Sequence, residues 1–331
     1  MDFAQLVLLS VVAGYGDPVD GYPSDEERAL VLWTNAARVA PDEFKQDYRT
    51  GGCTMGDFSA DEKTAKAPLY LDLALTEVAR VHSRDMRDNG CFQHDSCDGT
   101  DTWTRVGRYY TDANGGLGEN IAYGTTDPRY AVMSMWMCSH EGHRANIMSG
   151  SFNEMGGGMA SDFLTQDFAA GELKEGEPPV RVAAEYGDAV YADWGDDAAP
   201  ARLQLNVDGQ LTNLESFVGD PDNGVYYQSL DVEECTPWVV EWETRGGESG
   251  RFPATGALLA GNCAHEYDGS VAWGGTGGDD DDVGGPGKGG GNGVIALPEV
   301  MCGTGAGLVG PAGLIAALLL AARRRARVAT P

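Results

Sequence analysis

A glycine-rich segment near the C-terminus divides this chain and limits where a folded structure can lie. Eleven of the 20 residues over 274–293 are glycine, and four consecutive aspartates, 279–282, interrupt them. Such a segment has too little apolar surface to offset the entropy lost on ordering its backbone. We therefore predict a flexible tether over 274–300. The preceding part of the 331-residue chain is long enough for about two domains.

The charge balance limits the class of partner. The chain has 51 acidic residues against 23 Lys and Arg, which gives a formal net charge of −28 at pH 7. Nucleic-acid binding requires a basic face that neutralises phosphates. We therefore expect no nucleic-acid partner. Hydrophobic residues make up 42% of the chain, enough to build cores, so global disorder is also excluded.

The two ends of the chain carry signals for export. An apolar run over 6–13 is typical of a signal peptide over 1–20, although Asp2 is present and no Lys or Arg precedes the run. The signal peptide would then be truncated at its start, and a short buried strand or helix is the alternative. At the other end, the uncharged run 304–322 is long enough for a helix of about 28 Å, close to a bilayer core. Cys302 precedes this run and four arginines follow it, as expected for a cytoplasmic stop.

This C-terminal arrangement resembles bacterial surface-sorting signals, notably the myxobacterial kind. The resemblance covers 302–327 and implies a removable membrane signal with Cys302 as the attachment point. A permanent single-pass anchor is the alternative. Both predict a folded part outside the cell or on its surface, with the membrane contacted through the C-terminal tail.

The cysteine count fits an extracellular protein. With Cys302 set aside, six cysteines remain, and an even number predicts three disulfides that could pair in 15 ways. We expect Cys235–Cys263, because both residues lie in one β-rich stretch. For the other four we expect Cys91–Cys97 with Cys53–Cys138, and exchanged pairs among these four stay open. No Cys-x-x-Cys motif is present, which argues against a zinc ribbon.

Helices dominate the expected structure of the N-terminal half. Ser24 and Glu27 have the spacing of a capping box at the start of a first helix. Apolar residues at helical spacing predict a second helix over 73–89, ended by Gly90. A third helix is predicted over 127–138.

Five short motifs follow one another in this half. They are Phe92–His94, Gly118–Ala122, Gly142–Met148, Phe152–Gly158 and Thr165–Phe168. In this order and spacing they resemble the CAP superfamily (cysteine-rich secretory proteins, antigen 5 and pathogenesis-related 1), also called SCP, and especially its bacterial branch. The resemblance covers 23–170. It implies an α+β fold, an α-β-α sandwich in which helical layers enclose a small antiparallel sheet, with a surface cleft.

The resemblance also implies a cluster in the cleft, which holds two histidines and two acidic residues in this family. The matching positions are His94, Glu119 and His143. Ser139 stands where the family has the second acidic residue. Glu141 lies in a short insertion nearby and could supply the missing carboxylate.

The chemistry of this cluster allows two interpretations. Two imidazoles with a carboxylate suit zinc or another divalent cation, and a missing fourth ligand would leave a position for an activated water. Alternatively, a buried His–Glu–His cluster is a hydrogen-bonded network that fixes loop geometry. Ser139 near His143 and Glu119 also suggests a Ser–His–acid set, but no Gly-x-Ser-x-Gly elbow accompanies it. His82 lies on an apolar helix face and is expected to be a packing residue, and the aspartates at 95, 98 and 101 are expected to form a solvated loop rather than a calcium site.

The residues after 170 change in character. An acidic, proline-bearing linker is expected over 171–179, followed by short alternating runs and turn residues over 180–270. This pattern predicts an all-β sandwich of the immunoglobulin-like type.

Membership of the CAP superfamily does not by itself define an activity. The resemblance associates such domains with lipids, with protein partners and in some cases with proteolysis. We expect a secreted or surface-anchored, non-enzymatic module that binds a lipid, small ligand or protein partner in its cleft. A divalent-metal-dependent extracellular hydrolase acting on peptides and a structural envelope protein are the alternatives.

Overall fold

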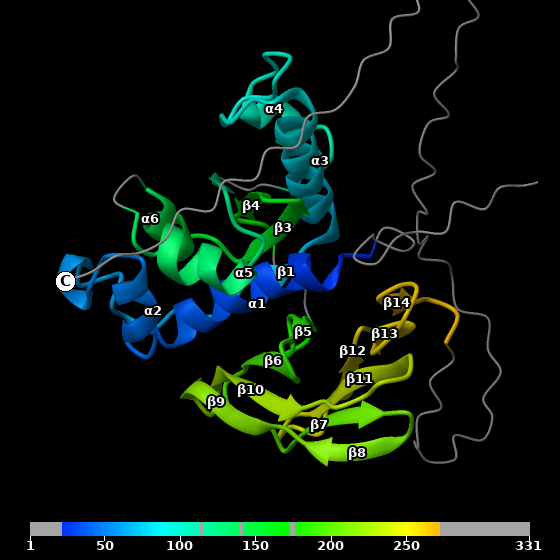
Figure 1. Cartoon of the computed structure of the whole chain (residues 1–331). Helices are drawn as coiled ribbons and strands as arrows, with labels where there is room; N and C mark the ends of the chain where they lie inside the picture. The colour runs from blue at the N-terminus through cyan, green and yellow to red at the C-terminus, as the bar shows by residue number, and fades with distance from the viewer. Residues whose placement is uncertain (1–21, 113–115, 140–141, 173–175, 272–331) are drawn as a thin grey trace, which may run out of the picture. The chain divides into compact units, whose positions relative to one another are not determined.

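The computed structural model describes residues 22–112, 116–139, 142–172 and 176–271 (Figure 1). The predicted signal peptide, the tether, the C-terminal tail with Cys302, and Glu141 lie outside the described residues. Among the residues that are described, no helix is long and apolar enough to cross a membrane.

The first helix, α1 (Asp25–Val39), is almost completely buried. The predicted capping box is confirmed: the Ser24 hydroxyl accepts from the Glu27 amide at 3.3 Å, and the Glu27 carboxylate accepts from the Ser24 amide at 3.1 Å. These bonds satisfy amides that have no partner inside the helix. Trp33 at the centre of α1 is fully buried, so the helix contributes to the core along most of its length.

The second predicted helix is confirmed at both ends. It is α3 (Leu73–Asn89), which begins after the Asp72 cap and ends at Gly90, whose φ of 66° favours glycine. The third predicted helix is only partly correct. A short α5 (Pro128–Tyr130) leads into η2 (Ala131–Trp136), whose hydrogen bonds have the π pattern. The remaining helices are α2 (Lys45–Thr50), η1 (Met55–Asp57), α4 (Thr102–Val106) and α6 (His143–Ile147).

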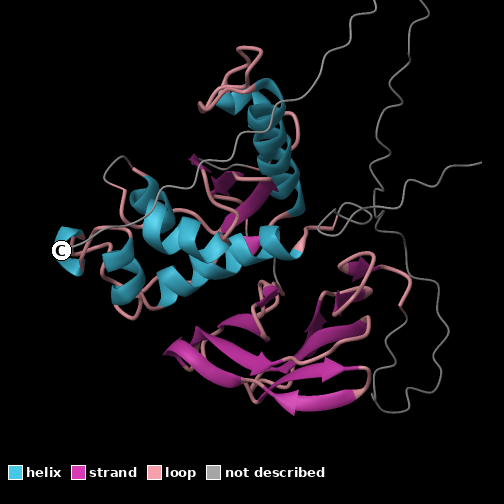
Figure 2. Cartoon of the chain, in the orientation of Figure 1, coloured by secondary structure: helices cyan, strands magenta, loops and turns pink. Residues whose placement is uncertain are grey.

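A four-stranded sheet forms the middle layer of the N-terminal region (Figure 2). Its order is β1-β3-β4-β2, with β1 (Tyr70–Leu71), β2 (Leu117–Tyr123), β3 (Glu154–Ala160) and β4 (Phe163–Ala169). The expectation of a fully antiparallel sheet was wrong at one edge, because β1 pairs parallel to β3. A strand of two residues gives too weak a pattern to reveal its direction.

Three consecutive glycines of β3 allow helices to approach both faces of this sheet. A Cβ on Gly156 or Gly158 would collide with the backbone of α3, at Thr76 and Ala79 respectively. A Cβ on Gly157 would lie 2.7 Å from the Glu27 carbonyl of α1. Since neighbouring strand residues point to opposite faces, α1 and α3 lie on opposite sides of the sheet. The expected α-β-α layering is therefore present.

Two further sheets follow after residue 180. One has the order β5-β6-β10-β9, and the other β14-β13-β11-β7-β8 with β12 paired to β11. Side chains from both sheets share one core that includes Trp194 and Trp238. The all-β prediction is confirmed, and the immunoglobulin-like assignment stays a prediction. The strands are β5 (Ala183–Tyr186), β6 (Ala189–Gly195), β7 (Arg202–Val207), β8 (Gln210–Asn213), β9 (Glu215–Asp220), β10 (Asn223–Ser229), β11 (Thr236–Glu243), β12 (Ser249–Phe252), β13 (Ala257–Ala260) and β14 (Tyr267–Asp268).

The β-rich region shares contacts with α1. Trp33 packs edge-on against Tyr186 with ring centroids 5.0 Å apart. The Asn35 side-chain amide donates to the buried Asp193 carboxylate at 2.6 Å. Val182 and Val225 belong to the same core as α1.

Three disulfides are present, and they are the expected pairs: Cys53–Cys138, Cys91–Cys97 and Cys235–Cys263. Their Cα–Cα distances of 5.4, 5.9 and 4.7 Å lie in the range normal for disulfides. The first ties the loop after α2 to the end of η2, and the second closes the loop that carries His94.

Candidate functional site

The loop over 91–97 brings His94 to the sheet. The Cys91–Cys97 disulfide closes this loop, and the Cys97 amide donates to the Asp85 carboxylate of α3 at 2.7 Å. Arg105 of α4 donates through Nη1 to the His94 carbonyl at 2.9 Å. A covalent bond and two charge-assisted hydrogen bonds therefore fix the backbone on both sides of His94.

Glu119 is the buried centre of the site. It lies on β2 with its side chain 1% exposed. His94 Nδ1 donates to Glu119 Oε1 at 2.8 Å, and Arg105 Nη2 donates to Glu119 Oε2. Each carboxylate oxygen therefore has a partner within the protein. The hydrogen bond to Glu119 raises the pKa of His94, while partial burial of the ring acts in the opposite direction.

A second carboxyl group lies beside Glu119. Asp167 of β4 is opposite Glu119 in the strand register and is completely buried. Burial raises the pKa of Asp167 well above its usual range, and the negative charge of Glu119 raises it further. The shift is in the direction that favours the neutral acid of Asp167, with Glu119 as the charged partner of Arg105.

His82 of α3 completes the buried part of the network. Its Nε2 donates to the Gln93 carbonyl at 3.0 Å and lies 4.0 Å from Glu119 Oε1. Burial lowers the pKa of His82, so the ring stays neutral. The expectation of a packing residue agrees with this burial, although the sequence did not indicate that His82 borders the Glu119 cluster.

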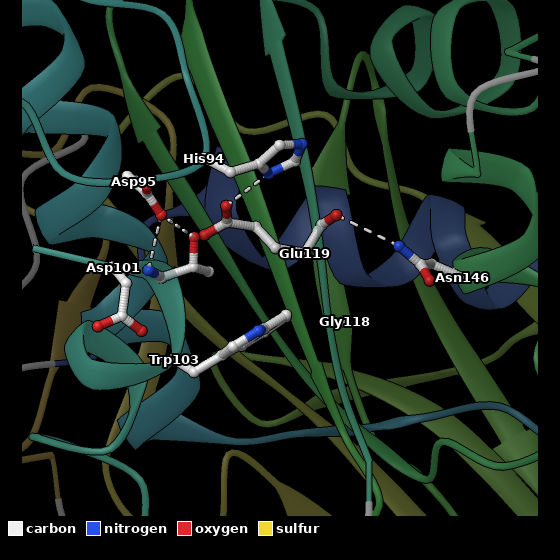
Figure 3. Close-up of a pocket in the computed structure, with 8 residues that line it drawn as sticks. His94, Asp95, Asp101, Trp103, Gly118, Glu119 and Asn146 are labelled. Carbon is white, nitrogen blue, oxygen red and sulfur yellow. Dashed lines mark hydrogen bonds and ion pairs between the residues drawn. The ribbon is translucent and has the colours of Figure 1, made fainter. Parts of the chain in front are cut away.

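The α6 segment approaches the site through Asn146. Its side-chain amide donates to the Glu119 carbonyl at 3.2 Å (Figure 3). It also donates to Asn120 Oδ1 at 2.9 Å. Asn120 in turn donates to the His143 carbonyl at 3.2 Å. His143 and Ser139 are half-buried, and neither is among the described residues that line the cleft. The α6 segment that carries His143 therefore lies beside Glu119, and the α6 side chain that lines the cleft is Asn146.

A cleft of about 470 Å³ opens beside the His94–Glu119 pair (Figure 3). Trp103 at the start of α4 has a side chain that is 50% exposed. The cleft has acidic, aromatic and amide side chains but, among its described lining residues, no Lys or Arg. These residues are His94, Asp95, Asp101, Thr102, Trp103, Gly118, Glu119 and Asn146.

Among the described residues, His94, Glu119 and His143 do not bring three ligand atoms close enough together to share a zinc ion. Within the described part of the chain, the one group of three ligand-type side chains close enough to share an ion is Asp85 with Cys91 and Cys97. Those cysteines form a disulfide, so they offer no thiolate. At Glu119, the Arg105 guanidinium already pairs with the carboxylate, and its positive charge opposes a bound cation there. We therefore derive no chemistry through a metal.

Sequence reasoning identified His94 and Glu119 but missed three partners. Arg105, Asp167 and Asn146 belong to no ligand pattern, and each acts through a contact that the fold creates. Asn146 lies inside the Gly142–Met148 motif and Asp167 inside Thr165–Phe168, and these positions were the available signals.

Comparison with known proteins finds similarity over part of the chain. The model of the Cysteine-rich secretory protein family (CAP) matches residues 32–169. The "Uncharacterized protein YkwD" of Bacillus subtilis is 37% identical over 112 residues, which are 32% of this chain and 41% of that protein. The "Uncharacterized membrane protein YlbC" of the same organism is 35% identical over 106 residues, 32% of this chain and 30% of that protein. The chain thus spans less than half of either relative.

Two solved structures are similar to part of this chain. An extracellular protein containing a SCP domain from Bacillus anthracis is 36% identical, with a TM-score of 0.30, and the match covers 31% of this chain and 34% of that one. An outer surface protein from Borrelia burgdorferi is 16% identical, with a TM-score of 0.30, over 44% of this chain and 93% of that one.

Proposed function

We propose that this protein is an extracellular, non-enzymatic module that binds a ligand in the cleft beside His94 and Glu119. The observation that carries the proposal is that the buried and the exposed side chains of the site have different roles. Glu119 is buried and bonded to His94 and Arg105, so it holds the loop and α4 in place. The exposed side chains of Asp95, Asp101 and Trp103 face the cleft, where they are available to a ligand.

Extracellular placement has support from covalent chemistry. Three disulfides persist in oxidising compartments and are rare in a reducing cytosol. The predicted signal peptide and C-terminal tail point to the same location, and the matching family is described as secretory. Surface anchoring through the tail is part of this proposal.

The test is ligand binding to the full chain. We would label the protein with 5-fluorotryptophan, assign the Trp103 resonance with Trp103→Phe, and screen lipids, sugars, amines and peptides by fluorine NMR. We expect at least one class to shift the Trp103 resonance in a saturable way. If no class does so and no protein co-purifies with the chain, the binding function is refuted and a structural envelope role remains.

A second function has one specific observation in its favour. Because His94 Nδ1 is bonded to Glu119, Nε2 lies on the other side of a ring that is 53% exposed. A carboxylate-oriented imidazole of this kind can act as a general base toward a water or hydroxyl. This observation supports the extracellular hydrolase as the alternative function.

His94→Gln separates the two functions. Glutamine can still donate a hydrogen bond to Glu119, but it cannot accept a proton as a base. A binding module should keep its ligand affinity within a few fold, whereas a hydrolase should lose turnover of peptide or cell-wall substrates completely. A matched measurement with a chelator shows whether any turnover depends on a divalent cation.

A further inference from the structure

Trp103 presents an aromatic surface at the cleft. It is the second residue of α4, which begins after the Asp101 cap, and half of its side chain is exposed. Figure 3 shows Trp103 and Asp101 on one side of the pocket and His94 on the other. The face of an indole is electron-rich and attracts cations that approach within about 6 Å.

Two carboxylates line the same cleft as this indole, and hydrogen bonds fix both of them. Asp101 Oδ1 accepts from the Thr104 amide at 3.0 Å, as the cap of α4. Asp95 Oδ1 accepts from the Thr102 amide at 3.1 Å and from the Thr102 hydroxyl at 3.3 Å. The bonds from Thr104 lower the pKa of Asp101, so this exposed group stays ionised near neutral pH.

The field of the protein favours positive ligands at this place. The net charge of the chain is −28, and the described residues that line the cleft include no Lys or Arg. Arg105 lies behind the cleft, where it is 3% exposed and paired with Glu119. A concave site with charges of one sign concentrates counter-ions of the other sign. A neutral ligand would gain nothing from this field.

We propose that the cleft binds an organic ammonium group, seated on the Trp103 indole with Asp95 and Asp101 as its counter-charges. This inference rests on the proposed binding function and names its ligand class. The shared chemistry is the cationic ammonium head, whether it is carried by a small quaternary amine or by a lysine side chain. The pocket volume of about 470 Å³ accommodates either one.

His94 makes the affinity depend on pH. The groups that act on its ring are Glu119 on β2, Arg105 on α4 and Asp95 in the same loop. His82 on α3 lies on the other side of this network, 4.0 Å from Glu119 Oε1. A protonated His94 adds a positive charge to the cleft and opposes a cationic ligand. Affinity for an ammonium should therefore rise as the pH rises through the pKa of His94, whereas affinity for a neutral ligand should not change.

The probes are choline, its uncharged isostere 3,3-dimethylbutan-1-ol, Nα-acetyl-lysine amide and N-acetylglucosamine. Each is titrated into the full chain labelled with 5-fluorotryptophan, to about 10 mM because a single exposed ammonium site is weak. We expect choline or the lysine amide to shift the Trp103 resonance, and the uncharged isostere to bind at least about fivefold more weakly. Tighter binding of choline would indicate a small amine as the ligand, and tighter binding of the lysine amide would indicate a peptide.

Matched variants assign the effect to the carboxylates. Asp101→Asn keeps a good helix cap and Asp95→Asn keeps an acceptor oxygen, so both should fold. Each should weaken choline or lysine amide binding by about threefold to tenfold. Asp98→Asn, on the same exposed loop but not among the lining residues, should leave affinity unchanged.

Three outcomes overturn the inference. These are equal binding of choline and its isostere, binding of the sugar alone, and no shift with either cation. In each of them the wider ligand screen still decides the proposed function, because a lipid, sugar or other peptide that shifts Trp103 would preserve the binding module without the ammonium.

Discussion

The buried pair of Glu119 and Asp167 gives a sharp energetic prediction. Removing the partner of a buried cation usually costs about 3–5 kcal/mol, because the remaining charge is uncompensated. Glu119→Gln removes the charge opposite Arg105. Asp167 lies next to Glu119 in the strand register, however, and the Glu119 charge is one cause of its raised pKa. Without that charge, Asp167 can ionise and take over the role of counter-ion.

The expected magnitudes follow from this exchange. Glu119→Gln should lower the free energy of unfolding by about 1–3 kcal/mol, which is less than the cost of leaving a buried cation uncompensated. Asp167→Asn should cost less than about 1 kcal/mol, because it replaces a neutral acid with a neutral amide of similar shape. The double variant leaves Arg105 with neither carboxylate, so it should cost about 3–5 kcal/mol. The loss of unfolding free energy in the double variant should thus exceed the sum of the losses in the two single variants.

The assay is urea unfolding of the full chain with its disulfides intact, followed by circular dichroism at pH 7. The coupling energy of the double-mutant cycle is the quantity of interest, and neighbouring groups that share a partner typically couple by about 0.5–3 kcal/mol. Additivity within about 0.3 kcal/mol would refute the exchange of charge. An Asp167→Asn cost equal to that of Glu119→Gln would show that Asp167 is already ionised in the native state.

Three other predictions test separate parts of the fold. Burial raises the pKa of Glu266 to about 7, so the folded state holds this proton more tightly than the unfolded state does. The free energy of unfolding should therefore fall as the pH rises from about 4.5 to 7. Urea unfolding of Glu266→Gln should show a flatter decline. Gly158→Ala should lower the free energy of unfolding by about 3 kcal/mol or prevent folding, because the new Cβ would collide with the α3 backbone. Gly150→Ala is the control: no atom lies within 4 Å of its Cβ position, so the free energy of unfolding should not change. Replacing both cysteines of the Cys91–Cys97 bond with serine should lower the pKa of His94 toward the ordinary histidine value of about 6.5, because a looser loop weakens the bond to Glu119. NMR titration measures this shift, and an unchanged pKa would show that Arg105 alone fixes the loop.

Local signals in the sequence predicted much of the fold. The capping box at Ser24 and the glycine at position 90 act within a few residues, and both were found where expected. The alternating runs expected over 180–270 include β7, which is a strand of six residues. The π geometry of η2 escaped prediction, because its apolar spacing is close to that of an α-helix.

The charged partners of Glu119 could not be predicted in this way. Asp167 lies against Glu119 only because β2 and β4 pair in one particular register, and a shift of one residue would turn its side chain to the other face. Arg105 reaches Glu119 from a five-residue helix whose position depends on the loop closed by a disulfide. Contacts between distant segments are set by tertiary packing, which a single sequence does not display.

The charges of the site, taken together, are the reason that we propose binding over catalysis. Glu119 and Arg105 neutralise each other in a buried pair, and burial beside them raises the pKa of Asp167, which favours its neutral form. Groups fixed in this way stabilise the loop and α4, and they have little charge left to stabilise a reacting substrate. The charge that does reach the cleft comes from Asp95 and Asp101, which are exposed at its edge. Ligand selectivity should therefore follow substitutions in the segment 95–103, and changes at Glu119 should act mainly on stability.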